Sequence, residues 1–147
     1  MEINQTTPQA AHAALTADRE AVYLDVRTED EFAAGHPAGA INVPVAFPNP
    51  SGGMLLNPDF QRVVESLLLR DKPIFCGCQS GGRSQTAAEI LAETGYTAVK
   101  NIRGGFGGAR DPSGQLLVPG WIDKELPTST EVDEANSYVG LKQQAGL

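Results

Sequence analysis

Short apolar runs alternate with helix-like segments along most of this chain. The apolar runs cover residues 21–26, 40–43, 73–77 and 97–102, and a further candidate surrounds Ile3. Runs of four to six residues have the length of strands, and strands that alternate with helices form parallel βαβ units. We therefore predict an α/β fold: a doubly wound parallel sheet of four to five strands, with helices on both faces.

Helix start and stop signals separate these runs. Thr28 and Glu31 have the spacing of a capping box, and Gly35 is placed to end the short helix that follows. Similar signals predict further helices at 8–15, 57–69 and 84–93.

The length of 147 residues suits one domain. We place that domain at residues 1–127 and interpret 128–147 as a C-terminal tail. Apolar residues recur at helical spacing in the tail, so it is expected to form a short helix packed on the domain. These residues are Val132, Ala135, Tyr138 and Leu141.

Composition excludes several classes of function. The chain has 11 basic and 18 acidic residues, for a net charge of −7, which lacks the basic footprint of a nucleic-acid or membrane-surface binder. No apolar run is long enough to span a membrane, and the first residues do not resemble a signal peptide, so we expect a cytoplasmic location. The two cysteines and two distant histidines predict neither a disulfide framework nor a metal site.

The chemically informative segment is 75–84, FCGCQSGGRS. Cys78 follows an apolar strand and faces the start of a helix, so the backbone N–H groups of residues 79–84 are expected to surround its sulfur. The helix dipole and Arg83 add positive potential, which favours the thiolate over the thiol. Gly81 and Gly82 permit the backbone conformations of so tight a loop.

Several segments together resemble the single-domain rhodanese (rhodanese-like sulfurtransferase) family. The active-site loop of that family is similar to Cys78-x-x-Gly81-x-Arg83-Ser84. The resemblance covers about residues 5–127. Its other landmarks are Asp25-Val26-Arg27, Glu31-Phe32, Gly35-His36-Pro37-x-Gly39-Ala40-x-Asn42-Val43-Pro44, Gly104-Gly105-Phe106 and Leu126-Pro127.

The resemblance implies a sulfurtransferase that needs no metal or other cofactor. Cys78 would be the catalytic nucleophile, taking a sulfane sulfur from thiosulfate or a small persulfide. It would carry that sulfur as a persulfide and pass it to cyanide or a thiol. The substrate would be bound by the rest of the loop: Gln79, Ser80, Gly81, Gly82, Arg83 and Ser84.

Three alternatives remain open. Cysteine phosphatases place five residues between the cysteine and the arginine of their loop, but four lie between Cys78 and Arg83, and the smaller ring suits a single sulfur atom. A non-catalytic rhodanese-like module that binds a protein would not need the intact loop. A dithiol redox switch would use Cys76 with Cys78, but we expect Cys76 to be buried and unreactive.

Further expectations concern the surroundings of the loop. The long segments 45–56 and 104–120 both follow strands, so both are expected to wall the Cys78 pocket. Arg27 and Glu31, four residues apart, are expected to form a structural ion pair. Asp25 is expected to serve as scaffold, as are His36, through a hydrogen bond, and Trp121, in the core.

Overall fold

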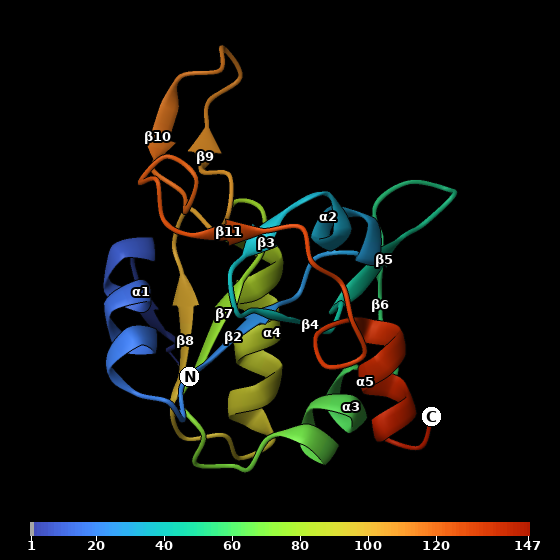
Figure 1. The fold of residues 1–147 in the computed structure, drawn as a ribbon. Coiled ribbons are helices and arrows are strands. Elements are labelled where there is room, and N and C mark those ends of the chain that lie inside the picture. The colour runs from blue at the N-terminus through green and yellow to red at the C-terminus, as the bar shows by residue number, and fades with distance from the viewer. Residues whose placement is uncertain (1) are drawn as a thin grey trace.

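Five parallel strands form the central sheet of the computed structural model, which describes residues 2–147 (Figure 1). In spatial order they are β1 (Asn4–Thr6), β8 (Val99–Ile102), β7 (Ile74–Gly77), β2 (Val22–Asp25) and β4 (Ile41–Asn42). Every neighbouring pair is parallel. The predicted α/β class is therefore confirmed, with the upper of the two predicted strand numbers.

The helices begin near the predicted signals. The Thr28 side chain accepts a hydrogen bond from the Glu31 N–H, and the Glu31 carboxylate accepts one from the Thr28 N–H, so the capping box is confirmed. No helix within residues 2–147 is long and apolar enough to cross a membrane. The helices are α1 (Pro8–Ala17), α2 (Glu29–Ala34), α3 (Phe60–Leu67), α4 (Gly82–Glu93) and α5 (Tyr138–Gln144).

Side chains of the strands alternate between two apolar cores, one on each face of the sheet. Leu24 and Cys76 point into a core shared with α3, α4 and α5. Tyr23 and Phe75, their neighbours in sequence, point into the opposite core, which α1 covers. Successive residues of a strand face opposite sides, so each central strand is buried on both faces. The sheet is thus doubly wound, as predicted.

Three small antiparallel pairs lie outside the central sheet. The segment after β4 folds into a hairpin of β5 (Ala46–Pro48) and β6 (Met54–Leu56). The segment after β8 ends in a hairpin of β9 (Ala109–Arg110) and β10 (Leu116–Val118), which projects from the body of the molecule (Figure 1). The third pair joins β3 (His36–Pro37) to β11 (Thr128–Ser129).

The C-terminal segment is packed into the same structure. Tyr138 and Leu141 of α5 are buried in the core that α3 and α4 share. The Tyr138 hydroxyl also accepts a hydrogen bond of 2.9 Å from the Asn57 side-chain amide. Residues 128–147 therefore contribute to the core through α5 and pair with β3 through β11.

Candidate active site

Cys78 stands directly after β7, at the carboxyl edge of the sheet, and the loop that follows leads straight into α4. This helix begins at Gly82, two residues before the predicted start. Gly81 caps the helix with a φ of 122°, a backbone angle that residues with a side chain rarely adopt. Gly82 has no positive φ. Only one of the two glycines is therefore needed for its backbone conformation.

The sulfur of Cys78 accepts a hydrogen bond at the start of this helix. The Gly81 N–H lies 3.1 Å from Sγ, and the Ser84 hydroxyl lies 3.4 Å from it. Within residues 2–147, this N–H is the one backbone donor that reaches the resting sulfur. Cys78 is 2% exposed, so its side chain is almost entirely shielded from solvent.

A chain of polar side chains runs from the sulfur to the edge of the sheet. The buried Ser84 hydroxyl lies 2.5 Å from Asn101 Oδ1, which is closer than its distance to the sulfur. Asn101 Nδ2 donates to Gln5 Oε1 at 2.9 Å and to the Gly81 carbonyl at 3.3 Å. Asn101 of β8 thus holds both the hydroxyl that faces Cys78 and the loop backbone.

The turn after β8 holds the other side of the loop. The N–H of Phe106 donates to the Cys78 carbonyl at 2.8 Å, and the N–H of Gly107 donates to the Gln79 carbonyl at 3.0 Å. Gly105, with a φ of 55°, packs so closely that a Cβ there would overlap the Cys78 carbonyl oxygen. The loop conformation therefore depends on a second turn more than twenty residues away in sequence.

Two arginines of the site, Arg27 and Arg83, are each paired with a carboxylate. Arg27 is 3% exposed, binds Asp25 at 2.8 Å and donates to the Gly35 carbonyl at 2.7 Å. Its guanidinium also lies over the Phe106 ring, 4.5 Å from the ring centre. Asp25 and Arg27 are thus buried and paired with each other, and Arg27 also donates to Gln79 Oε1 at 3.3 Å; their scaffold role stays a prediction.

Arg83 makes a two-point ion pair with Glu31, with distances of 2.7 and 3.0 Å. The predicted pair between Arg27 and Glu31 is wrong. Hydrogen bonding from Arg83 is the main cause that lowers the pKa of Glu31 from 4.5 to about 2. The Glu31 carboxylate in turn offsets the positive charge that Arg83 was expected to add to the site.

Cys76 and Cys78 are both free thiols with different surroundings. Cys76 is fully buried in the core between β7 and α4, and burial raises the pKa of its thiol far above the ordinary value. Its predicted burial is confirmed. Within residues 2–147, no group of three His, Cys, Asp or Glu side chains could hold a metal ion.

Comparisons with known proteins agree with this arrangement. A family model described as "Rhodanese-like domain" matches residues 7–110, which is more than two thirds of the chain. The chain belongs to the rhodanese-like family.

Two named relatives and one solved structure show moderate sequence identity to this chain. Thiosulfate sulfurtransferase 16, chloroplastic, of Arabidopsis thaliana is 49% identical over 96 residues, covering 65% of this chain and 78% of that protein. Senescence-associated protein DIN1 of Raphanus sativus is 43% identical over 105 residues, covering 71% of this chain; the chain spans about half of that protein, 50%. The crystal structure of Rv0390 from M. tuberculosis has a TM-score of 0.73 at 29% identity, covering 89% of this chain and all of that one.

This rhodanese-like domain brings together most of the residues singled out from the sequence. Cys78, Gly81, Arg83 and Ser84 meet at the start of α4, while Gln79 and Ser80 are exposed at the rim. His36 is buried, with Nδ1 2.8 Å from the Phe32 carbonyl oxygen, and it stacks on the Phe32 ring. Trp121 is buried in the core, as predicted.

Sequence reasoning missed Asn101. Its position in the sequence could have indicated it, because Asn101 is a carboxamide inside the apolar run 97–102. That run forms β8, which neighbours β7, the strand that precedes Cys78. A buried carboxamide needs partners for its polar atoms, and here the partners are Ser84, Gly81 and Gln5.

Two segments, 45–56 and 104–120, were predicted to wall the site, and the second lies beside the cysteine loop. Residues 104–108 bind the loop directly, and Gly104, Phe106 and Val118 line cavities beside it. Residues 45–56 line neither of these cavities, although Val45 and Ala46 belong to the same buried cluster as Cys78. The reason is the strand order: β8 neighbours β7, whereas β4 lies at the far edge of the sheet beyond β2.

Proposed function

We propose that this rhodanese-like domain is a sulfurtransferase that carries sulfane sulfur as a persulfide on Cys78. One observation carries the proposal: Cys78 Sγ lies at the N-terminal end of α4, within 3.1 Å of the Gly81 N–H. An N–H donor and the positive end of a helix dipole stabilise a negative sulfur. The chain also matches proteins named thiosulfate sulfurtransferases.

The first half-reaction loads the cysteine. The Cys78 thiolate attacks the outer sulfur of thiosulfate or of a small persulfide, and an S–S bond forms as the S–S bond of the donor breaks. The electron pair leaves with sulfite or with the donor thiolate. The terminal sulfur of the enzyme persulfide then carries the negative charge, which the loop donors stabilise.

The second half-reaction unloads the cysteine. Cyanide or a thiolate attacks the terminal sulfur, the bond from that sulfur to Cys78 Sγ breaks, and the electron pair returns to Cys78 as thiolate. Each half-reaction conserves charge and needs no separate oxidant. Donor and acceptor bind in turn, which is the ping-pong pattern of covalent catalysis.

Mass spectrometry of the intact protein tests the proposal. After incubation with thiosulfate or, separately, with glutathione persulfide, the protein is expected to gain the mass of one sulfur atom on the peptide that contains Cys78. Cys78→Ser should lose both the added mass and sulfur transfer.

Cys76→Ser is the matched control, since its side chain lies two residues away and is fully buried. It should keep most of the transfer activity per folded molecule. Full activity in Cys78→Ser would refute the proposal. Reversible loss of activity with formation of a Cys76–Cys78 bridge would favour the dithiol switch instead.

A further inference from the structure

A shallow cavity of about 330 Å³, wide open to solvent, lies beside the cysteine loop, on the side of β1 and β8. Its wall includes the loop residues Ser80 and Gly81, together with Gln85 of α4. Gly81 connects the cavity to the chemistry, because its N–H donates to Cys78 Sγ at 3.1 Å. Gly81 thus contacts both the cavity and the sulfur, whereas Cys78 itself does not line the cavity.

Arg103 gives this cavity a charge that the rest of the site lacks. Arg27 and Arg83 are held by Asp25 and Glu31, but Arg103 is exposed and has no carboxylate partner within residues 2–147. The cavity wall itself contains no acidic residue. In a protein of net charge −7, an unpaired guanidinium in a cavity free of carboxylates attracts an anion.

The other polar groups of the wall are suited to an anion with hydrogen-bond acceptors. The Gln5 side chain is used within the protein: Oε1 accepts from Asn101, and Nε2 donates to Gln85 Oε1 at 2.7 Å. Within residues 2–147, the Gln85 side-chain NH2 group and the Ser80 hydroxyl make no hydrogen bond to another side chain. Both are donors beside Arg103 in the cavity wall.

We propose that this cavity binds the carboxylate of a small thiol that accepts sulfur from Cys78, with Arg103 as the anchor. The inference rests on the proposed function. The thiolate of the acceptor attacks the terminal sulfur of the Cys78 persulfide and forms a new S–S bond. The bond to Cys78 Sγ breaks, its electron pair stays on Cys78, and the acceptor leaves as a persulfide.

A thiol that carries a carboxylate is a longer molecule than thiosulfate. In thiosulfate the sulfonate group is bonded directly to the sulfur that is attacked, so its charged oxygens stay next to that sulfur. In a thiol such as glutathione, several bonds separate the sulfur from the carboxylates, so one carboxylate can reach beyond the loop. A guanidinium binds a carboxylate through two parallel hydrogen bonds, which is the strongest polar contact available here.

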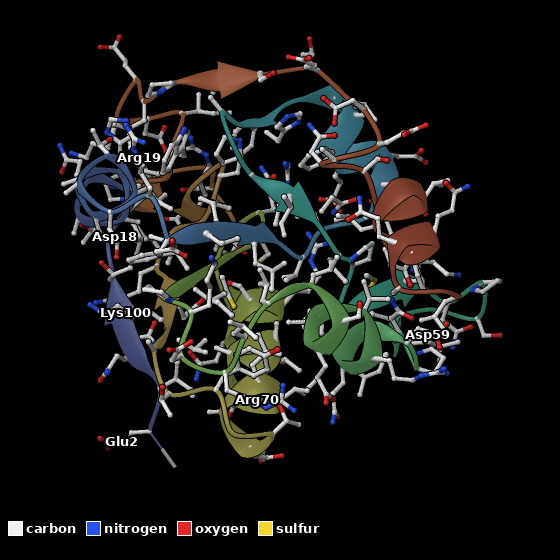
Figure 2. The ribbon with its side chains drawn as sticks, turned by 60° about the horizontal axis from the view of Figure 1, so that its bottom comes forward. Glu2, Asp18, Arg19, Asp59, Arg70 and Lys100 are labelled. Atoms are coloured by element: carbon white, nitrogen blue, oxygen red, sulfur yellow. The ribbon has the colours of Figure 1, made fainter. Side chains whose placement is uncertain are left out.

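The kinetic test compares glutathione with its uncharged diethyl ester as acceptors. We expect Arg103→Gln to raise the KM for glutathione at least about tenfold more than the KM for the ester, as the loss of one charge-assisted contact predicts. Arg19→Gln is the matched control: Arg19 lies after α1 and lines neither cavity beside the loop (Figure 2). It removes the same charge and should leave the ratio of the two KM values unchanged.

A binding test needs no turnover. S-methylglutathione carries the same carboxylates but cannot accept sulfur, so its binding can be measured by calorimetry. We expect Arg103→Gln to abolish measurable binding and Arg19→Gln to retain it. The protein could bind S-methylglutathione through Arg103 and yet transfer no sulfur. That result would support the cavity assignment and refute only the proposed function.

Two results would overturn the inference. One is an equal effect of Arg103→Gln on glutathione and its ester, together with unchanged binding of S-methylglutathione. The other is a rise in the KM for thiosulfate with no change for glutathione, which would assign Arg103 to the donor. Circular dichroism of each variant, compared with wild type, establishes that the protein is folded.

Discussion

At the scale of single residues, the ion pair of Glu31 with Arg83 couples the start of α4 to α2. The pKa of Glu31 in the folded protein, about 2, lies below its ordinary value of 4.5. A carboxyl with a lowered pKa contributes stability above its ordinary pKa and loses that contribution as the pH falls through the folded value. Stability from this pair is therefore present at neutral pH and lost between about pH 4.5 and 2.

We predict that Glu31→Gln lowers the free energy of unfolding by about 1 kcal/mol at pH 7, since the pair is partly exposed. The difference from wild type should shrink toward zero near pH 2. Urea unfolding at several pH values measures both. Glu89→Gln, on the exposed side of α4, is the control; an equal pH-dependent loss in that variant would contradict the assignment to the ion pair.

Ser84 and Asn101 form the other residue-scale unit. Ser84→Ala is expected to cost about 1–3 kcal/mol of stability, because the Asn101 oxygen remains buried without its closest partner. In an Asn101→Leu background the same change should cost much less. A double-mutant cycle from denaturant unfolding measures this coupling, and additive effects would show that the 2.5 Å contact carries no energy.

Individual residues show what sequence can and cannot supply. The burial of Cys76 could be predicted from its place in an apolar run. The location of Cys78 at the carboxyl edge of the sheet could be predicted from its place directly after a strand. The pair of Arg27 with Glu31 was predicted from the four-residue spacing that applies inside a helix. Arg27, however, precedes the cap at Thr28, so it does not share a helical face with Glu31. The true partner of Glu31 comes from 52 residues away.

At the scale of elements, the turn at residues 104–108 is as important to the loop as α4 is. We predict that Gly105→Ala costs more than about 2 kcal/mol and strongly lowers sulfur transfer, because the added methyl group would overlap the Cys78 carbonyl. Thermal unfolding and transfer rates measure these effects.

The matched control for this variant is Gly114→Ala in the β9–β10 hairpin. Gly114 also has a positive φ, 89°, but nothing lies within 4 Å of the position of a Cβ. This variant should suffer only the backbone strain, about 1–2 kcal/mol, and keep its activity. Equal loss of activity in both variants would contradict a specific role for the turn.

The elements that sequence reasoning missed are the short exposed ones. The segments 45–56 and 104–120 were expected to be loops, yet each contains a hairpin. Their strands are two or three residues long and largely exposed, so no alternation of buried and exposed positions marks them. The central strands were predictable because both of their faces are buried, which requires continuous apolar runs.

At the scale of the whole molecule, α5 ties the end of the chain to the core. Leu141→Ala is expected to lower the free energy of unfolding by about 2–5 kcal/mol, since Leu141 is 3% exposed. Val139→Ala, on the same helix but 59% exposed, should change it by less than about 0.5 kcal/mol. Denaturant unfolding distinguishes them, and similar values for both would indicate that α5 does not contribute to the folded core.

The pairing of β1 with β8 has a consequence for how the protein is made. Gln5 and Asn101, which bond across these strands, are 96 residues apart in sequence. On a ribosome, synthesis at about 5–20 residues per second leaves β1 without its partner for on the order of 5–20 s. The waiting strand is only Asn4–Thr6, short and polar, which makes it a poor template for pairing with another nascent chain. The polar chain behind the cysteine loop can therefore close only after β8 has been synthesised.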